Sequence, residues 1–154
     1  FDAAQGFRMM TLEDLVPKDV PAMTEVPHHG KNTIPIPGAT RFAKVCVRPD
    51  GPEENIGEIW GYNRNSQFLE TVVGPGYYVA HAHHVKGEVL VNYLRTPPRK
   101  PAHWPEILRN DERLSFFVYN GTQDVLRGVS KHVSIGRAQK GGSWMPAWFI
   151  LCRD

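Results

Sequence analysis

Residues 77–95 have the sequence YYVAHAHHVKGEVLVNYLR, which contains two apolar runs on either side of Val85-Lys86-Gly87. Both runs are rich in the β-branched and aromatic residues that strands favour. A short loop that contains glycine between two such runs is typical of a β-hairpin. We therefore predict two antiparallel strands, Tyr77–His84 and Glu88–Arg95, joined by a tight turn.

The same pattern continues on both sides of this hairpin. Further candidate strands are bounded by Gly, Pro, Asn or Asp, and they lie at Arg41–Arg48, Ile56–Tyr62, Gln67–Val73, His132–Gln139 and Ala147–Arg153. A second hairpin turn is expected near Gly141-Gly142. Seven short strands at close spacing predict a strongly curved antiparallel β-sheet or a β-barrel.

The segment Asp111–Lys131 has two interpretations. Its apolar residues recur at steps of three and four, as on an amphipathic helix; they are Leu114, Phe117, Val118, Val125, Leu126 and Val129. Asn120-Gly121, in contrast, is a strong signal for a hairpin turn. Because the helical spacing persists across this turn, we favour one long helix that packs across the curved sheet. The predicted fold class is therefore α+β.

Residues 1–40 are expected to form an irregular N-terminal arm. Thr11 and Asp14 have the spacing of a capping box, which predicts one short helix. The segments Pro27–Gly30 and Ile34–Gly38 contain prolines, which lack the N–H group that a strand ladder needs. We therefore expect these segments to be extended and to cover the sheet without joining it.

Length and composition indicate a globular protein. The chain has 154 residues, 41% of them hydrophobic and 22% charged, which suits a single domain 1–154 with the arm at 1–40 and the sheet and helix at 41–154. Eighteen Lys and Arg against 16 Asp and Glu are scattered, so no nucleic-acid partner is expected. No apolar stretch approaches the ~18 residues of a membrane span, so no membrane partner is expected either.

Three further properties follow less directly from the composition. We expect a soluble protein, with the cytoplasm preferred among the compartments. The sequence leaves open whether the chain forms a homo-oligomer. It also leaves open whether Cys46 and Cys152 form a disulfide or remain two thiols.

The histidines near the first hairpin are the candidate catalytic residues. Side chains alternate along a strand, so Tyr77, His81 and His83 are predicted to share one face. Imidazole titrates near neutral pH, which suits it to general acid–base catalysis. We predict non-redox chemistry such as isomerisation, cyclisation, hydration or elimination, with His81 and His83 as acid or base and Tyr77 positioning the substrate. The alternative is that both histidines are half-exposed or hydrogen-bonded residues without a catalytic role.

His81-x-His83, followed by Glu88 after the turn, is similar to the first metal motif of the cupin family. The resemblance implies a metal-dependent enzyme in which His81, His83 and Glu88 bind the metal and a late histidine, His132, joins them. Two imidazoles and one carboxylate suit Fe(II), Mn(II) or a similar divalent ion. Outside this alternative the sequence requires no cofactor.

Aromatic side chains are the candidate ligand-binding residues. Tyr and Trp combine a large apolar body with a polar tip, as a pocket for an aromatic ligand requires; the candidates are Trp60, Tyr62, Tyr93, Trp104 and Trp148. The alternative is that they fill the core. The proline-rich loop Arg95–Pro105 is predicted either to close a barrel mouth as a lid or to cover the sheet.

Together these patterns predict a β-barrel-like protein that binds a small apolar or aromatic molecule. It is expected to act on that molecule as an enzyme of the isomerase or lyase type. A cupin-like metalloenzyme and a non-catalytic ligand carrier are the two alternatives.

Overall fold

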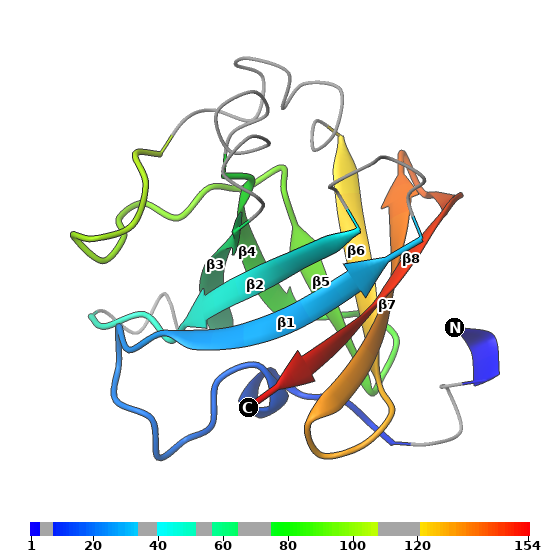
Figure 1. The fold of residues 1–154 in the computed structure, drawn as a ribbon, viewed down its shortest axis with the longest axis horizontal. Coiled ribbons are helices and arrows are strands. Elements are labelled where there is room, and N and C mark those ends of the chain that lie inside the picture. Colours follow the sequence, from blue (N-terminus) through cyan, green and yellow to red (C-terminus); the bar gives the residue numbers. More distant parts are fainter. Residues whose placement is uncertain (4–7, 34–39, 52–56, 65–74, 108–120) are drawn as a thin grey trace.

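The computed structural model describes residues 1–3, 8–33, 40–51, 57–64, 75–107 and 121–154. In these ranges eight strands form one closed antiparallel barrel, in which each strand pairs with the next and β8 returns to β1 (Figure 1). The strands are β1 (Val26–Asn32), β2 (Arg41–Val47), β3 (Glu58–Arg64), β4 (Tyr77–Ala82), β5 (Glu88–Asn92), β6 (Thr122–Gly128), β7 (Val133–Lys140) and β8 (Ser143–Arg153). No helix of the described residues is long and apolar enough to cross a membrane.

The prediction of an α+β fold with one long helix at Asp111–Lys131 is wrong. Residues 121–131 contain β6, which pairs with β5 and β7, and residues 111–120 lie outside the described ranges. Neighbouring residues of a strand point to opposite faces, yet Val125 and Leu126 are both fully buried. Both faces of β6 are therefore covered, and the strand lacks the alternation of apolar and polar residues that would have identified it.

The N-terminal arm contains an additional strand. β1 pairs with β2 and β8 and closes the barrel at a segment predicted to stay outside the sheet. Pairing with β8 begins only at His28, so Pro27 lies where β1 has β2 as its sole partner strand. A proline is tolerated at such an end because no second neighbour requires its missing N–H.

Several other local predictions agree with the structure. Leu12–Asp14 forms one turn of 3-10 helix, and the Thr11 N–H donates to the Asp14 carboxylate at 2.8 Å. Both predicted hairpins are confirmed, and Gly87 at the first turn has a φ of 86°, which favours glycine. The predicted strand Gln67–Val73 lies outside the described residues.

Two apolar clusters cover the two faces of the sheet. The interior cluster contains residues from strands around the barrel, and Met10, Leu15 and Val16 of the N-terminal segment add to it. This segment lies at the lower end of the barrel in Figure 1. The outer cluster lies against β2, β3 and β4 and consists of Val45, Val47, Trp60, Tyr62, Tyr77, Val79 and Trp104.

Aromatic rings occupy much of the barrel interior. Gly61 and Gly136 face inward, and a Cβ atom at either position would collide with a ring, that of Tyr78 or Phe149. The two rings therefore cross over a glycine of the neighbouring strand.

Candidate functional site

A cluster of four polar side chains lies inside the barrel. Lys44 of β2, Asn63 of β3, Tyr93 after β5 and Asp124 of β6 are all buried, and Lys44 is only 1% exposed. Lys44 pairs with Asn63 across β2 and β3, so both side chains point to the same face. We call these four residues the luminal cluster.

Lys44 and Tyr93 connect the four members of the luminal cluster in one network. Lys44 Nζ lies 3.0 Å from Asn63 Oδ1 and 3.0 Å from Asp124 Oδ2, and it also bonds to the Tyr93 hydroxyl. The Tyr93 hydroxyl accepts from Asn63 Nδ2 at 2.9 Å and donates to Asp124 Oδ2 at 2.9 Å. All three protons of the ammonium therefore have acceptors, and the charges of Lys44 and Asp124 balance.

Aromatic rings surround the ammonium group. Its nitrogen lies 5.0–5.7 Å from the ring centroids of Phe42, Tyr78, Tyr93 and Phe149. Cation–π attraction acts at such distances. Even so, replacing a buried ion pair with apolar residues often leaves a protein equally stable or more stable. We therefore predict that the fold does not require a charged pair at this position.

Asp124 has one carboxylate oxygen that the cluster does not use. Lys44 and Tyr93 both bond to Oδ2, and among the described residues no group donates to Oδ1. The side chain of Asp124 is 8% exposed, against 1% for Lys44. Asp124 is therefore slightly more exposed than Lys44, and its Oδ1 can accept a further hydrogen bond.

The two neighbouring groups with reactive protons stay neutral. Cys46 Sγ lies 3.2 Å from the Tyr78 hydroxyl inside the barrel. Burial raises the pKa of Cys46 to about 11 and raises the pKa of Tyr78 well above its usual value. A protonated thiol is a poor nucleophile, so Cys46 serves as an apolar wall. Cys152 is free and exposed, so the two cysteines do not form a disulfide.

The sequence analysis identified Tyr93 but missed Lys44, Asn63 and Asp124. One signal was available, since Lys44 is the single charged residue in the apolar run Phe42–Val47. Asn63 and Asp124 carry no comparable signal because each stands beside other polar residues. Their proximity to Lys44 arises only when four strands come together in the barrel.

The predicted catalytic histidines lie on the outer face of the barrel. His81 pairs with Glu58, whose side chain contacts Arg95 on that face. His83 Nδ1 lies 2.7 Å from Glu88 Oε2, and the other oxygen of Glu88 accepts from Arg127 Nε at 2.7 Å. A carboxylate that accepts from Nδ1 leaves Nε2 of His83 as the ring nitrogen that can exchange a proton.

The three predicted metal ligands do not meet. His81 Nδ1 bonds to the Ala82 carbonyl at 3.0 Å, away from the pair of His83 and Glu88. His132 lies elsewhere, at the turn between β6 and β7. Across the described ranges no three His, Cys, Asp or Glu side chains are grouped closely enough to hold a metal ion. The cupin-like motif therefore has no complete ligand set in this part of the chain.

Most of the predicted ligand-binding aromatics also lie outside the barrel. Trp104 packs on Tyr62 and Tyr77 with ring centroids 4.8 and 6.1 Å apart, and Trp60 belongs to the same outer cluster. The Tyr77 hydroxyl donates to the Pro105 carbonyl, and burial raises its pKa. Trp148 of β8 is 46% exposed. The proline-rich loop thus covers the outer face of β2–β4, and of these aromatic residues only Tyr93 belongs to the luminal cluster.

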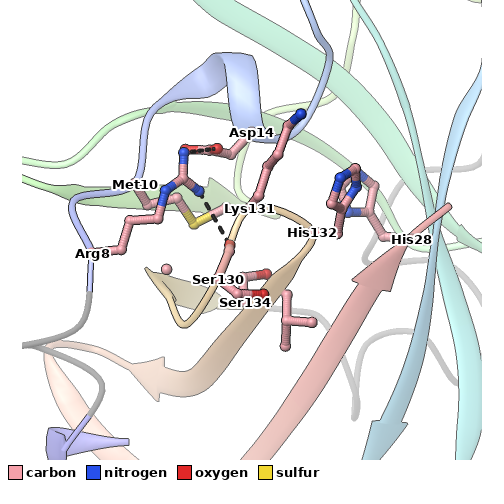
Figure 2. Close-up of a pocket in the computed structure, with 10 residues that line it drawn as sticks. Arg8, Met10, Asp14, His28, Ser130, Lys131, His132 and Ser134 are labelled. Carbon is pink, nitrogen blue, oxygen red and sulfur yellow. Dashed lines mark hydrogen bonds and ion pairs between the residues drawn. The ribbon is translucent and has the colours of Figure 1, made fainter.

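A small pocket lies at the end of the barrel that the N-terminal segment closes (Figure 2). It encloses about 210 Å³, including the part open to solvent. His28 forms part of its wall, and its Nε2 bonds to the Leu15 carbonyl at 2.9 Å. The pKa of His28 is lowered from its usual 6.5 to about 4, mainly by burial and in smaller part by charge repulsion from Arg153 and Lys44.

The depressed pKa of His28 predicts loss of stability in mild acid. The unfolded chain protonates this imidazole as the pH falls below about 6.5, whereas the folded chain does so only near 4. Folding then loses up to about 3 kcal/mol between these values. Urea unfolding of the wild type and His28→Gln across this range measures the effect, because the variant should show a shallower slope. An NMR titration of the His28 ring in the folded protein that gave a pKa near 6.5 would contradict this prediction.

The chain matches no known protein family, no curated protein and no solved structure. The fold and the site of the described residues define a closed, up-and-down, eight-stranded antiparallel β-barrel with a buried ionic cluster.

Proposed function

We propose that the protein binds a small, largely apolar or aromatic molecule at the luminal cluster. The observation that carries this proposal is the buried pair of Lys44 and Asp124, in which Asp124 Oδ1 has no donor among the described residues. Ligand sites are commonly apolar and aromatic with a few fixed polar groups. The ligand is expected to carry a hydroxyl or N–H group that donates to Oδ1.

A reaction at this site would use the same oxygen. A carboxylate that accepts a hydrogen bond from a substrate can also take its proton, as isomerisation and elimination require. His83, held by Glu88 on the outer face, is the second position suited to acid–base chemistry. A carrier would use the luminal contacts alone and leave the ligand unchanged.

A pair of probe molecules tests the proposed hydrogen bond. 2-Naphthol has an aromatic body and a hydroxyl donor, whereas 2-methoxynaphthalene has the same body without the donor. A hydrogen bond to a charged group contributes about 1.5–3 kcal/mol, so the wild type should bind 2-naphthol at least about tenfold more tightly. Fluorescence titration measures both affinities.

Two variants locate the binding site. The double variant Lys44→Met/Asp124→Leu keeps the interior filled but removes the acceptor, so it should bind the two probes equally. His83→Gln alters only the outer face and should keep the wild-type preference. Equal binding of both probes by the wild type, or loss of the preference in His83→Gln, would exclude the luminal site. Native mass spectrometry of the purified protein then identifies any small molecule that the barrel retains.

A further inference from the structure

Three large apolar side chains are exposed on the outer face of β8. Trp144, Trp148 and Ile150 are 45–46% exposed, and no other strand of the described residues exposes a large apolar side chain. Ile150 pairs with Ile135 of β7, and the residues on either side of Ile150 point into the barrel core. Trp148 pairs with Arg137, whose guanidinium lies 5.3 Å from the centre of the Trp144 ring. We call Trp144, Trp148, Ile150 and Ile135 the β8 face.

The strands around the β8 face carry positive charge and no carboxylate. β7, β8 and β1, which lie side by side in Figure 1, contain no Asp or Glu. Lys31 of β1 is exposed and pairs in register with Arg41 of β2, while Arg137 lies on β7. Among the described residues none of these three cations has a carboxylate partner, and Asp154, directly after β8, pairs with His29 at 3.5 Å. The β8 face is therefore an apolar centre with unneutralised positive charge around it.

This combination of charge and aromatic rings favours a lipid partner over a protein. Tryptophan prefers the level of the headgroups at a membrane surface, and Lys and Arg are attracted to anionic headgroups there. A peptide could not join this face as an extra strand, because the barrel of the described residues is closed and leaves no strand edge. A second copy of the chain would bring like charges together, and their repulsion would oppose a dimer through this face.

We propose that the β8 face docks on an anionic lipid surface. Trp148 and Ile150 enter the headgroup region, and Lys31 and Arg137 attract the lipid phosphates. Docking at the surface requires no spanning segment, so the length of the apolar runs, on which the expectation of no membrane partner rested, does not bear on it. The luminal cluster points to the opposite side of the sheet, so this contact is independent of ligand binding inside the barrel.

Co-sedimentation with lipid vesicles tests the proposed contact. The wild type should bind vesicles of phosphatidylcholine and phosphatidylglycerol in equal parts, should not bind phosphatidylcholine alone, and should be released by sodium chloride. Lys31→Gln and Trp148→Ser should each weaken binding about fivefold, the first by losing a charge and the second by losing apolar area. Lys86→Gln and Leu94→Ser are the matched controls, because both residues are exposed outside the β8 face. Both controls should bind as the wild type does.

Fluorescence shows which face meets the lipid. Trp60 and Trp104 are at most 3% exposed, so brominated lipids in the anionic vesicles should quench mainly Trp144 and Trp148, and Trp148→Ser should lose much of this quenching. The proposal is overturned if the wild type does not bind anionic vesicles, if it binds without quenching, or if the controls lose as much affinity as the β8-face variants. Self-association that Trp148→Ser abolishes would make the face a contact between copies, and binding to soluble poly-L-glutamate without quenching by the vesicles would assign it to an acidic protein. Circular dichroism of each variant verifies that the barrel is folded.

Discussion

Replacing Lys44 with alanine should destabilise the protein by about 3–5 kcal/mol, because it leaves the buried carboxylate of Asp124 without its counter-ion. Tyr93 and Asn63 lose a partner in the same change, since both bond to the ammonium group. Urea denaturation of Lys44→Ala and the wild type measures the difference in the free energy of unfolding.

The double variant Lys44→Met/Asp124→Leu distinguishes the effect of losing the ion pair from the effect of leaving one charge buried without its partner. Removing both charges avoids an unpaired ion, so this variant should be as stable as the wild type or more stable. The exposed pair of Lys18 and Glu13, 2.8 Å apart, is the control, and Lys18→Ala should cost less than about 1 kcal/mol. If the double variant lost as much stability as Lys44→Ala, the cluster would be a structural requirement of the barrel.

This comparison bears directly on function. If two apolar residues stabilise the interior at least as well as the ion pair does, stability alone does not explain why the chain has Lys44 and Asp124. A ligand that bonds to Asp124 Oδ1 supplies that explanation. The stability of the double variant and its failure to distinguish the two naphthalene probes are therefore two independent measurements of the same site.

The strands and hairpins could be predicted because their signals are local. β-branched runs and the glycines near 87 and 141 mark β4, β5, β7 and β8 without reference to the rest of the chain. β1 could not be predicted in this way, because Pro27 argues against a strand unless the position of β8 is known. β6 was missed because both of its faces are buried, which removes the period of two.

The orientation of the side chains could not be predicted for a related reason. Alternation correctly grouped Tyr77 with His81, but it does not say which face of a strand is the interior. β3 and β4 have apolar side chains on both faces. The outer face is apolar as well because it packs against the loop that carries Trp104. The aromatic residues expected in a ligand pocket therefore form a second core outside the barrel, and the polar residues inside it were overlooked.

Trp104 is predicted to be the residue that holds the loop of residues 95–107 on the barrel. Its indole packs on Tyr62 and Tyr77, is 3% exposed, and donates from Nε1 to the Glu25 carboxylate. Truncating a buried Trp to Ala typically costs about 3–5 kcal/mol, so Trp104→Ala should be among the most destabilising single changes in the chain. Urea denaturation measures this loss.

His103→Ala provides a control in the same loop. His103 also bonds to Glu25, at 2.8 Å, but its side chain is 67% exposed, so the change should cost less than about 1 kcal/mol. Limited trypsin digestion adds a local readout, because Trp104→Ala should expose the bond after Arg95 or Arg99 while His103→Ala leaves it protected. Equal protection in both variants would mean that the loop is held by its prolines and by Arg99, which pairs with Asp50. Cleavage in Trp104→Ala alone would show that the outer core, built from the residues first expected in a pocket, fixes this loop to β2–β4.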